Sequence, residues 1–233
     1  MPYRRLPNTD QARLRALKAV VAQSEECSIR DLAVSLKTVG EVRHFLDKFE
    51  KAQIDYQTCF ECQSKAARKH QANVRMARLY ISHFIQVLNL AVIRAEVRLA
   101  HKDMYGLSRD SNTLPDLSSE ASLVEWGGKI IQGEQKRLSV GGIPIYNPTI
   151  AKVKVHYDIF VESYTLQKGY QQRTQRSLEL LASMRARADE LILDCWNQVE
   201  KKFQEITPND RRLNRCREYG LVYYFRSHEK IKE

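Results

Sequence analysis

The pattern of apolar positions along the chain is helical almost throughout. In the first segment, four apolar residues recur at helical spacing: Leu14, Leu17, Val20 and Val21. Asn8 is placed to cap this helix, with Gln11 three residues later in the position of a capping-box partner. A second, short helix is expected from Ser28 to Leu36, with Ser28 as its cap. Residues 1–37 are therefore predicted to form short helices packed on the rest of the fold.

Two long segments, 38–105 and 148–206, carry the strongest helical pattern. In the first, apolar residues recur at heptad-like intervals through Val42, Phe45, Leu46, Phe49, Tyr56 and Phe60, and again through Ala77, Ile81, Phe84, Leu88 and Ala91. In both segments the pattern fades in the middle, over 63–74 and 167–177, and Gly169 is a natural break in the latter. We interpret each polar stretch as a turn, with a polar waist inside one very long helix as the alternative.

The remaining segments are shorter and less regular. In the connection 106–147, Gly106 is a candidate glycine cap, and Ser118 or Ser119 caps a helix that runs to about Leu138. The glycine pair Gly127-Gly128 within it is interpreted as a flexible joint. Residues 207–233 are expected to hold a short helix closed by Gly220, followed by a strand-like run from Leu221 to Phe225. Because an isolated strand is not stable, this run needs a partner, either Ile143 to Tyr146 or another protein.

These elements predict an all-α fold that forms one structural domain. The preferred architecture is an antiparallel up-down bundle of four long helices, with short accessory helices and a short C-terminal strand. The alternative is a coiled-coil hairpin of two very long helices. The bundle is preferred because the apolar face of residues 79–93 is too wide to be covered by one neighbouring helix. The hairpin stays open if the protein dimerises through this face.

Composition is that of a globular protein, with 43% hydrophobic and 28% charged residues and only 9 glycines and 6 prolines. The most apolar stretch, 79–93, is too short and too polar to be expected to cross a bilayer, and the N-terminus lacks the apolar run of a secretory signal. Five scattered cysteines fit a reducing compartment better than a disulfide framework. We therefore expect a cytoplasmic protein without membrane contact.

The distribution of charge is more informative than the net charge of +10. No acidic residue lies between Glu61 and Glu96, or between Glu162 and Glu179. The bundle brings these tracts together at one tip and the hairpin brings them together at mid-length. We call their eight basic residues the basic cap: Lys65, Arg68, Lys69, Arg75, Arg78, Lys168, Arg173 and Arg176. Such a patch attracts phosphates or carboxylates, with Tyr170, His70, Gln71, Gln171 and Asn73 as candidates for stacking and hydrogen bonding; the alternative is that it only keeps the turns soluble.

Other constellations are incomplete as chemical sites. Cys59 and Cys62 have the spacing of a zinc or redox pair but lack two further ligands, and Glu41 with His44 forms one ferritin-like Glu-x-x-His element without a second. Residues 28–45 resemble a helix-turn-helix, although the second helix runs on too far. No phosphate loop or nucleophile–base arrangement can be assembled. Metal, cofactor and small-molecule substrate are therefore not expected.

The leading functional hypothesis is a non-enzymatic interaction or assembly protein, whose partner is another protein or a second copy of the chain. The alternative is a nucleic-acid-binding protein that uses the basic cap or residues 28–46. An enzyme with a site inside the bundle lacks the residues that would identify it.

Overall fold

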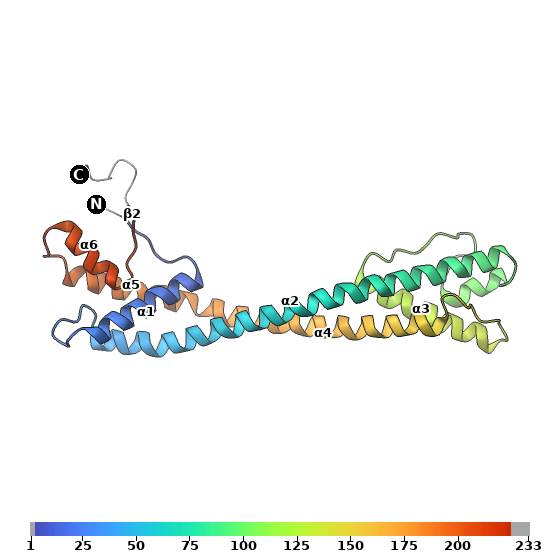
Figure 1. Cartoon of the computed structure of the whole chain (residues 1–233), viewed down its shortest axis with the longest axis horizontal. Helices are drawn as coiled ribbons and strands as arrows, with labels where there is room; N and C mark the ends of the chain where they lie inside the picture. Colours follow the sequence, from blue (N-terminus) through green and yellow to red (C-terminus); the bar gives the residue numbers. More distant parts are fainter. Residues whose placement is uncertain (1–2, 225–233) are drawn as a thin grey trace. The chain divides into compact units, whose positions relative to one another are not determined.

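The computed structural model describes residues 3–224, and its fold is all-α, with 74% of the residues in helices (Figure 1). In chain order the elements are β1 (Tyr3–Arg4), α1 (Asp10–Glu26), α2 (Leu36–Ile93), the 3-10 helix η1 (Leu99–Tyr105), α3 (Glu120–Ser139), α4 (Ile150–Ser183), α5 (Arg185–Lys202), α6 (Asn209–Glu218) and β2 (Tyr223–Tyr224). The predicted fold class is confirmed, whereas the four-helix bundle arrangement is not.

The predicted turn at residues 63–74 is wrong, because α2 continues through it as one helix of 58 residues. This stretch loses its apolar pattern, but it consists mainly of lysine, arginine, alanine and glutamine and has no glycine or proline. These residues propagate a helix well without a buried stripe. The polar waist, which was the alternative, describes this part of the chain.

The break at Gly169 is also wrong, since α4 runs through it for 34 residues. One glycine costs a helix only about 1 kcal/mol, which the flanking turns of a long helix readily offset. The second long segment breaks later instead, at Met184, between α4 and α5. No feature of the sequence explains that position.

The chain divides into two compact units. Unit 1 comprises residues 1–59 and 174–233, and unit 2 comprises residues 60–173. The sequence predicts that the chain forms one structural domain, and this stays a prediction.

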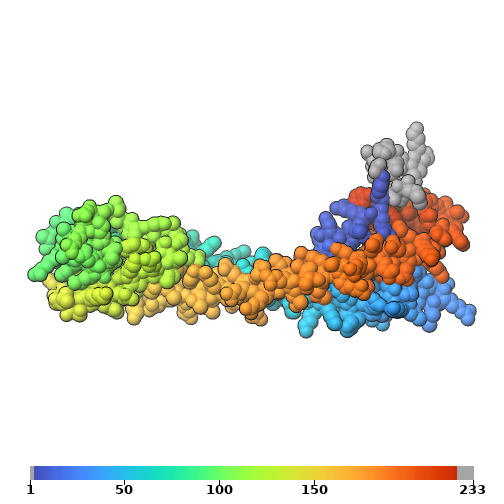
Figure 2. All heavy atoms as spheres, turned by 180° about the vertical axis from the view of Figure 1, so that it is seen from behind, coloured from blue at the N-terminus to red at the C-terminus, as the bar shows by residue number. Residues whose placement is uncertain are grey.

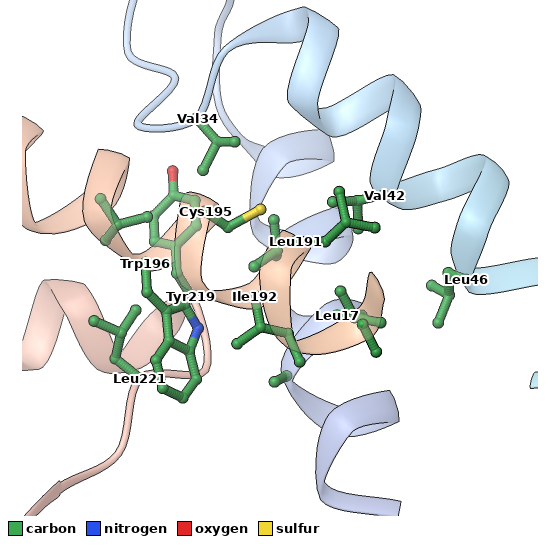
Figure 3. Close-up of a cluster of buried hydrophobic side chains, with 14 of the residues drawn as sticks. Leu17, Val34, Val42, Leu46, Leu191, Ile192, Cys195, Trp196, Tyr219 and Leu221 are labelled. Carbon is green, nitrogen blue, oxygen red and sulfur yellow. The ribbon is translucent and has the colours of Figure 1, made fainter. Parts of the chain in front are cut away.

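The core of unit 1 is assembled from segments far apart in the sequence. Figure 3 shows Leu191, Ile192 and Trp196 of α5 gathered with side chains from α1, α2 and the C-terminal segment. Trp196 is only 1% exposed. The space-filling view in Figure 2 shows the N-terminal segment, in dark blue, lying against the orange and red C-terminal helices, and α1 contacts both α5 and α6.

Two predicted details of unit 1 are wrong. No helix forms from Ser28 to Leu36: the Ser28 side chain donates to Asp31 at 2.6 Å inside a turn, and α2 begins at Leu36. The C-terminal strand is present at Tyr223–Tyr224, but its antiparallel partner is β1. Ile143 to Tyr146 is not that partner, since Tyr146 bridges to Thr149 instead. Phe225, the last residue of the predicted strand, lies outside the described residues.

Unit 2 has its own core, in which α3 and η1 pack against α2 and α4. Buried side chains of α2 such as Phe84 and Leu88 belong to one apolar cluster with Ile130 of α3 and Phe160 of α4. The predicted helix start at Ser119 is confirmed, because its side chain accepts a hydrogen bond from the Ser122 amide.

The interpretation of Gly127-Gly128 as a flexible joint is wrong, because α3 runs through both residues and Gly127, like Gly133, is a site of close packing. A Cβ atom on Gly127 would lie 2.2 Å from the ring of Tyr157, and one on Gly133 would lie 2.5 Å from the ring of Tyr105. Gly106 adopts the positive φ of 68° that the predicted cap requires.

By length and composition alone, α2 contains a stretch that is apolar enough to cross a membrane. Of its most apolar 18-residue window, 39% is buried inside the protein. A single such helix is weak evidence for a span, because the core helix of a soluble protein passes the same test.

Candidate functional site

The residues of the basic cap lie on two helices. Lys65, Arg68, Lys69, Arg75 and Arg78 are on α2, and Lys168, Arg173 and Arg176 are on α4. The first seven belong to unit 2 and Arg176 belongs to unit 1. Because neither helix turns at its polar stretch, these residues do not gather at a tip of a bundle. They are spread along the helices instead.

Within unit 2, the structure brings part of the basic cap into a groove between α2 and α4. The groove has a volume of about 490 Å³. From α2 it is lined by Lys65 and Lys69, and from α4 by the apolar side chains of Ile159 and Leu166, which are 45% and 56% exposed. Glu162 is the carboxylate among its lining residues. The groove thus combines a basic edge with an apolar wall.

His70 forms part of the floor of this groove. Its ring is 4% exposed and stacks on Phe160 with the ring centroids 5.9 Å apart. Nδ1 lies 2.9 Å from the Ser163 hydroxyl and Nε2 lies 3.0 Å from a carboxylate oxygen of Glu120, the first residue of α3. Both ring nitrogens are therefore engaged, and His70 joins α2 to α3 and α4 rather than offering itself to a ligand.

Two members of the basic cap also have structural partners. Arg78 donates to the backbone carbonyls of Leu117 and Ser118 at 2.9 and 2.8 Å, which ties the connection before α3 to α2. The Lys168 ammonium lies 4.9 Å from the ring centroid of Tyr164, a cation–π contact. These partners make Arg78 in particular a structural residue, which sequence spacing alone could not reveal.

The other four basic residues of α2 in unit 2 are exposed: Lys65, Arg68, Lys69 and Arg75. Across the described chain, residues 3–224, no carboxylate lies within ion-pair distance of any of them. The acid-free tract contributes to this, because α2 carries no carboxylate between Glu61 and Glu96. Their positive charges are consequently available at the surface.

Sequence reasoning missed a buried ionic network in unit 2. Glu134 and Arg137 of α3 are 0% and 2% exposed and pair at 2.8 Å. The hydroxyl of Tyr105 donates to Glu134 and accepts from Arg137 Nε at 2.8 Å, while Arg137 also donates to the Ile143 carbonyl. Burial, followed by the hydrogen bond to Glu134, raises the pKa of Tyr105. The network connects η1, α3 and the segment after α3. Because each of its groups has hydrogen-bond or ionic partners within the protein, we interpret it as structural.

The remaining sequence candidates do not form a chemical site. Among residues 3–224, no cluster of three or more histidine, cysteine or acidic side chains is placed to hold a metal ion. Cys59 is half-buried and Cys62 is exposed. The helix-turn-helix interpretation of 28–45 is wrong, because its first helix does not form.

Comparison with known proteins found no matching family model, curated protein or solved structure.

Proposed function

We propose that this chain is a non-enzymatic interaction or assembly protein that contacts an anionic partner through unit 2. The observation that carries the proposal is the set of four exposed basic residues on α2 without carboxylate partners in the described chain. They replace the basic cap as the proposed contact, since Arg78 and Lys168 have partners of their own, Arg173 lies on α4 and Arg176 belongs to unit 1. We call these four residues, Lys65, Arg68, Lys69 and Arg75, the basic tract.

Unpaired positive charges at close spacing attract anions and give binding that weakens steeply with salt. The groove beside the basic tract has exposed apolar side chains, Ile159 and Leu166, which favour contact with a protein over contact with a sugar-phosphate backbone. An acidic protein segment satisfies both features.

Nucleic acid is the second candidate, supported by the same four charges. It would bind the basic tract through phosphates, releasing counterions. The stacking residue expected for a single strand is Tyr170, which lines the groove. The two candidates are distinguished by whether the wild-type protein binds an acidic polypeptide or a nucleic acid more tightly.

The test measures binding of fluorescent poly-L-glutamate and of a mixed DNA and RNA oligonucleotide panel at graded salt. The variant replaces the basic tract (K65Q/R68Q/K69Q/R75Q). The matched control removes four exposed basic residues of unit 1 instead (K48Q/K51Q/K201Q/R211Q).

We expect the wild-type protein and the control to bind polyglutamate in a salt-dependent way, and the basic-tract variant to bind at least tenfold more weakly. Equal loss in both variants would mean that only net charge matters and would contradict the proposal. Tighter binding of DNA or RNA than of polyglutamate, lost in the basic-tract variant alone, would establish the second candidate instead.

A further inference from the structure

The exposed face of α2 in unit 2 continues beyond the basic tract as an apolar stripe. With about 3.6 residues per turn, six further positions fall on the same side of the helix as the basic tract, within a sector of about 120°. We call these positions the α2 seam: Met76, Leu79, His83, Gln86, Leu90 and Ile93. All six are exposed. One face of one helix is therefore basic in its first half and largely apolar in its second.

The α2 seam has the spacing of a coiled-coil contact. Its positions alternate by three and four residues, as the a and d positions of a heptad do. Its four apolar side chains are 39% (Met76), 56% (Leu79), 50% (Leu90) and 64% (Ile93) exposed. By the rise per residue, the seam extends over about 26 Å, which is the length of a helix of about 17 residues.

The core of unit 2 does not use these side chains. The opposite face of the same stretch of α2 already fills it, with Ile81, Phe84 and Leu88 each fully buried. The apolar face of residues 79–93, which is unusually wide in the sequence, is therefore only partly covered by the fold. The excess lies on the surface in heptad spacing.

The charges beside the seam indicate what covers it. No acidic residue occurs between Glu61 and Glu96, so α2 offers only positive charge at this face. A second copy that used the same face would bring basic tract onto basic tract in a parallel arrangement, and basic tract onto apolar seam in an antiparallel one. Neither arrangement supplies a carboxylate from the α2 stretch between Glu61 and Glu96.

Nucleic acid and a bilayer fit this face less well than a helix does. The apolar half gives a phosphate backbone nothing to bind. A bilayer takes up a broad apolar face, whereas the α2 seam is two positions wide and has His83 and Gln86 at its middle. A narrow seam with polar positions inside it is typical of helix pairing, where such positions fix the register.

We propose that the α2 seam and the basic tract together bind one amphipathic helix of a partner protein, with apolar a and d positions along its length and carboxylates at one end. This inference rests on the proposed function for its charged half and adds the kind of partner. The apolar end of the helix lies on the seam and its acidic end lies on the basic tract.

The probe is a synthetic peptide of about four heptads, with leucine at the a and d positions, glutamate flanking them in one half and glutamine elsewhere. Two versions carry the glutamates in the N-terminal or the C-terminal half, and a third carries lysine in place of glutamate. Binding is measured by anisotropy of the labelled peptide.

Two variants of matched exposure probe the apolar half. The seam variant is L79Q/L90Q/I93Q, and its control is L99Q/V140Q/I143Q, which changes three comparably exposed apolar residues of unit 2 away from the seam. All six side chains are half or more exposed, so both variants are expected to keep the melting temperature of the wild-type protein.

We expect one glutamate peptide to bind the wild-type protein and the control, and to bind the seam variant and the K65Q/R68Q/K69Q/R75Q variant at least tenfold more weakly. The lysine peptide should not bind. If the seam variant binds like the wild-type protein while the basic-tract variant does not, the seam inference is overturned and the proposed function stands. If the basic-tract variant keeps full affinity, the proposed function fails and the charged half of the inference fails with it.

Two further results would overturn the inference. One is a wild-type dimer, detected by analytical ultracentrifugation, that the seam variant cannot form. The other is binding to vesicles of phosphatidylserine and phosphatidylcholine that depends on the seam and exceeds binding to both glutamate peptides.

Discussion

Unit 1 and unit 2 differ in how charge and apolar surface are arranged. In unit 1 several basic residues pair with carboxylates from distant segments, as Arg13 does with Asp189 at 2.7 Å and Arg185 does with Asp10 at 2.8 Å. In unit 2 an arginine and a glutamate are buried, whereas the basic tract at the surface has no carboxylate partner in the described chain.

In unit 2, exposed charge and exposed apolar surface share one face of α2. The ion pairs Arg13–Asp189 and Arg185–Asp10 of unit 1 close α1 onto α5, so they serve the fold. The basic tract has no carboxylate partner in the described chain, and the α2 seam lies outside the core cluster of unit 2. Unit 2 is therefore the unit in which we place partner binding.

The largest expected effect follows from the buried charges of unit 2. Replacing Arg137 by methionine removes the cationic partner of Glu134 in the core, which costs about 3–5 kcal/mol. Native-state hydrogen exchange should show faster opening of α3 than of α5. The double variant E134L/R137M should recover most of the loss, because it removes both charges; equal loss in the two variants would contradict the role of the ion pair.

Close packing in unit 2 gives the next effect. Gly127→Ala places a methyl group onto the Tyr157 ring, which must move or be compressed, at a cost of about 1–3 kcal/mol. Chemical denaturation followed by Trp126 fluorescence in a W196F background measures it. Gly169→Ala is the matched control in the same unit, because nothing lies within 4 Å of its added methyl group. There we expect a gain of up to about 1 kcal/mol.

Alkaline pH should weaken unit 1 before unit 2. Burial raises the pKa of the Cys195 thiol to about 12, so the folded chain keeps this proton while the unfolded chain begins to lose it near pH 9. The free energy of unfolding should then fall by about 1 kcal/mol between pH 9 and 10. Urea unfolding followed by Trp196 fluorescence in a W126F background measures this, with reductant present. In C195A the slope should shrink; an unchanged slope would show that another group is responsible.

The smallest expected effect concerns the basic tract. Because its side chains have no carboxylate partners in the described chain, K65Q/R68Q/K69Q/R75Q should change the free energy of unfolding by no more than about 0.5 kcal/mol. Thermal unfolding measures this directly. A clear loss of stability would mean that these charges support the fold, and it would remove the contrast between the two units.

The sequence predicts local structure in this protein better than it predicts long-range contacts. Ser119 and Gly106 mark the cap of α3 and the end of η1 because capping depends on a few neighbouring residues. The predicted turn in 63–74 is wrong because the loss of an apolar stripe indicates that a helix is not packed on that side. It does not indicate that the helix ends. The pairing of β2 with β1 joins the two ends of the chain, which no local pattern encodes.

The candidate site follows the same division. The basic tract can be read from the acid-free interval between Glu61 and Glu96, but the removal of Arg78 from it depends on carbonyls about 40 residues away. The exposure of the α2 seam likewise depends on which face of α2 the core covers. Within a stretch as apolar as 79–93, spacing alone does not distinguish the two faces.

The most direct test of partner binding by unit 2 is isothermal titration of the wild-type protein with the tighter glutamate peptide, at several temperatures and two salt concentrations. Burial of the α2 seam predicts a negative heat capacity change, and pairing with the basic tract predicts an affinity that falls as salt rises. A heat capacity change near zero, or an affinity that does not respond to salt, would contradict the account.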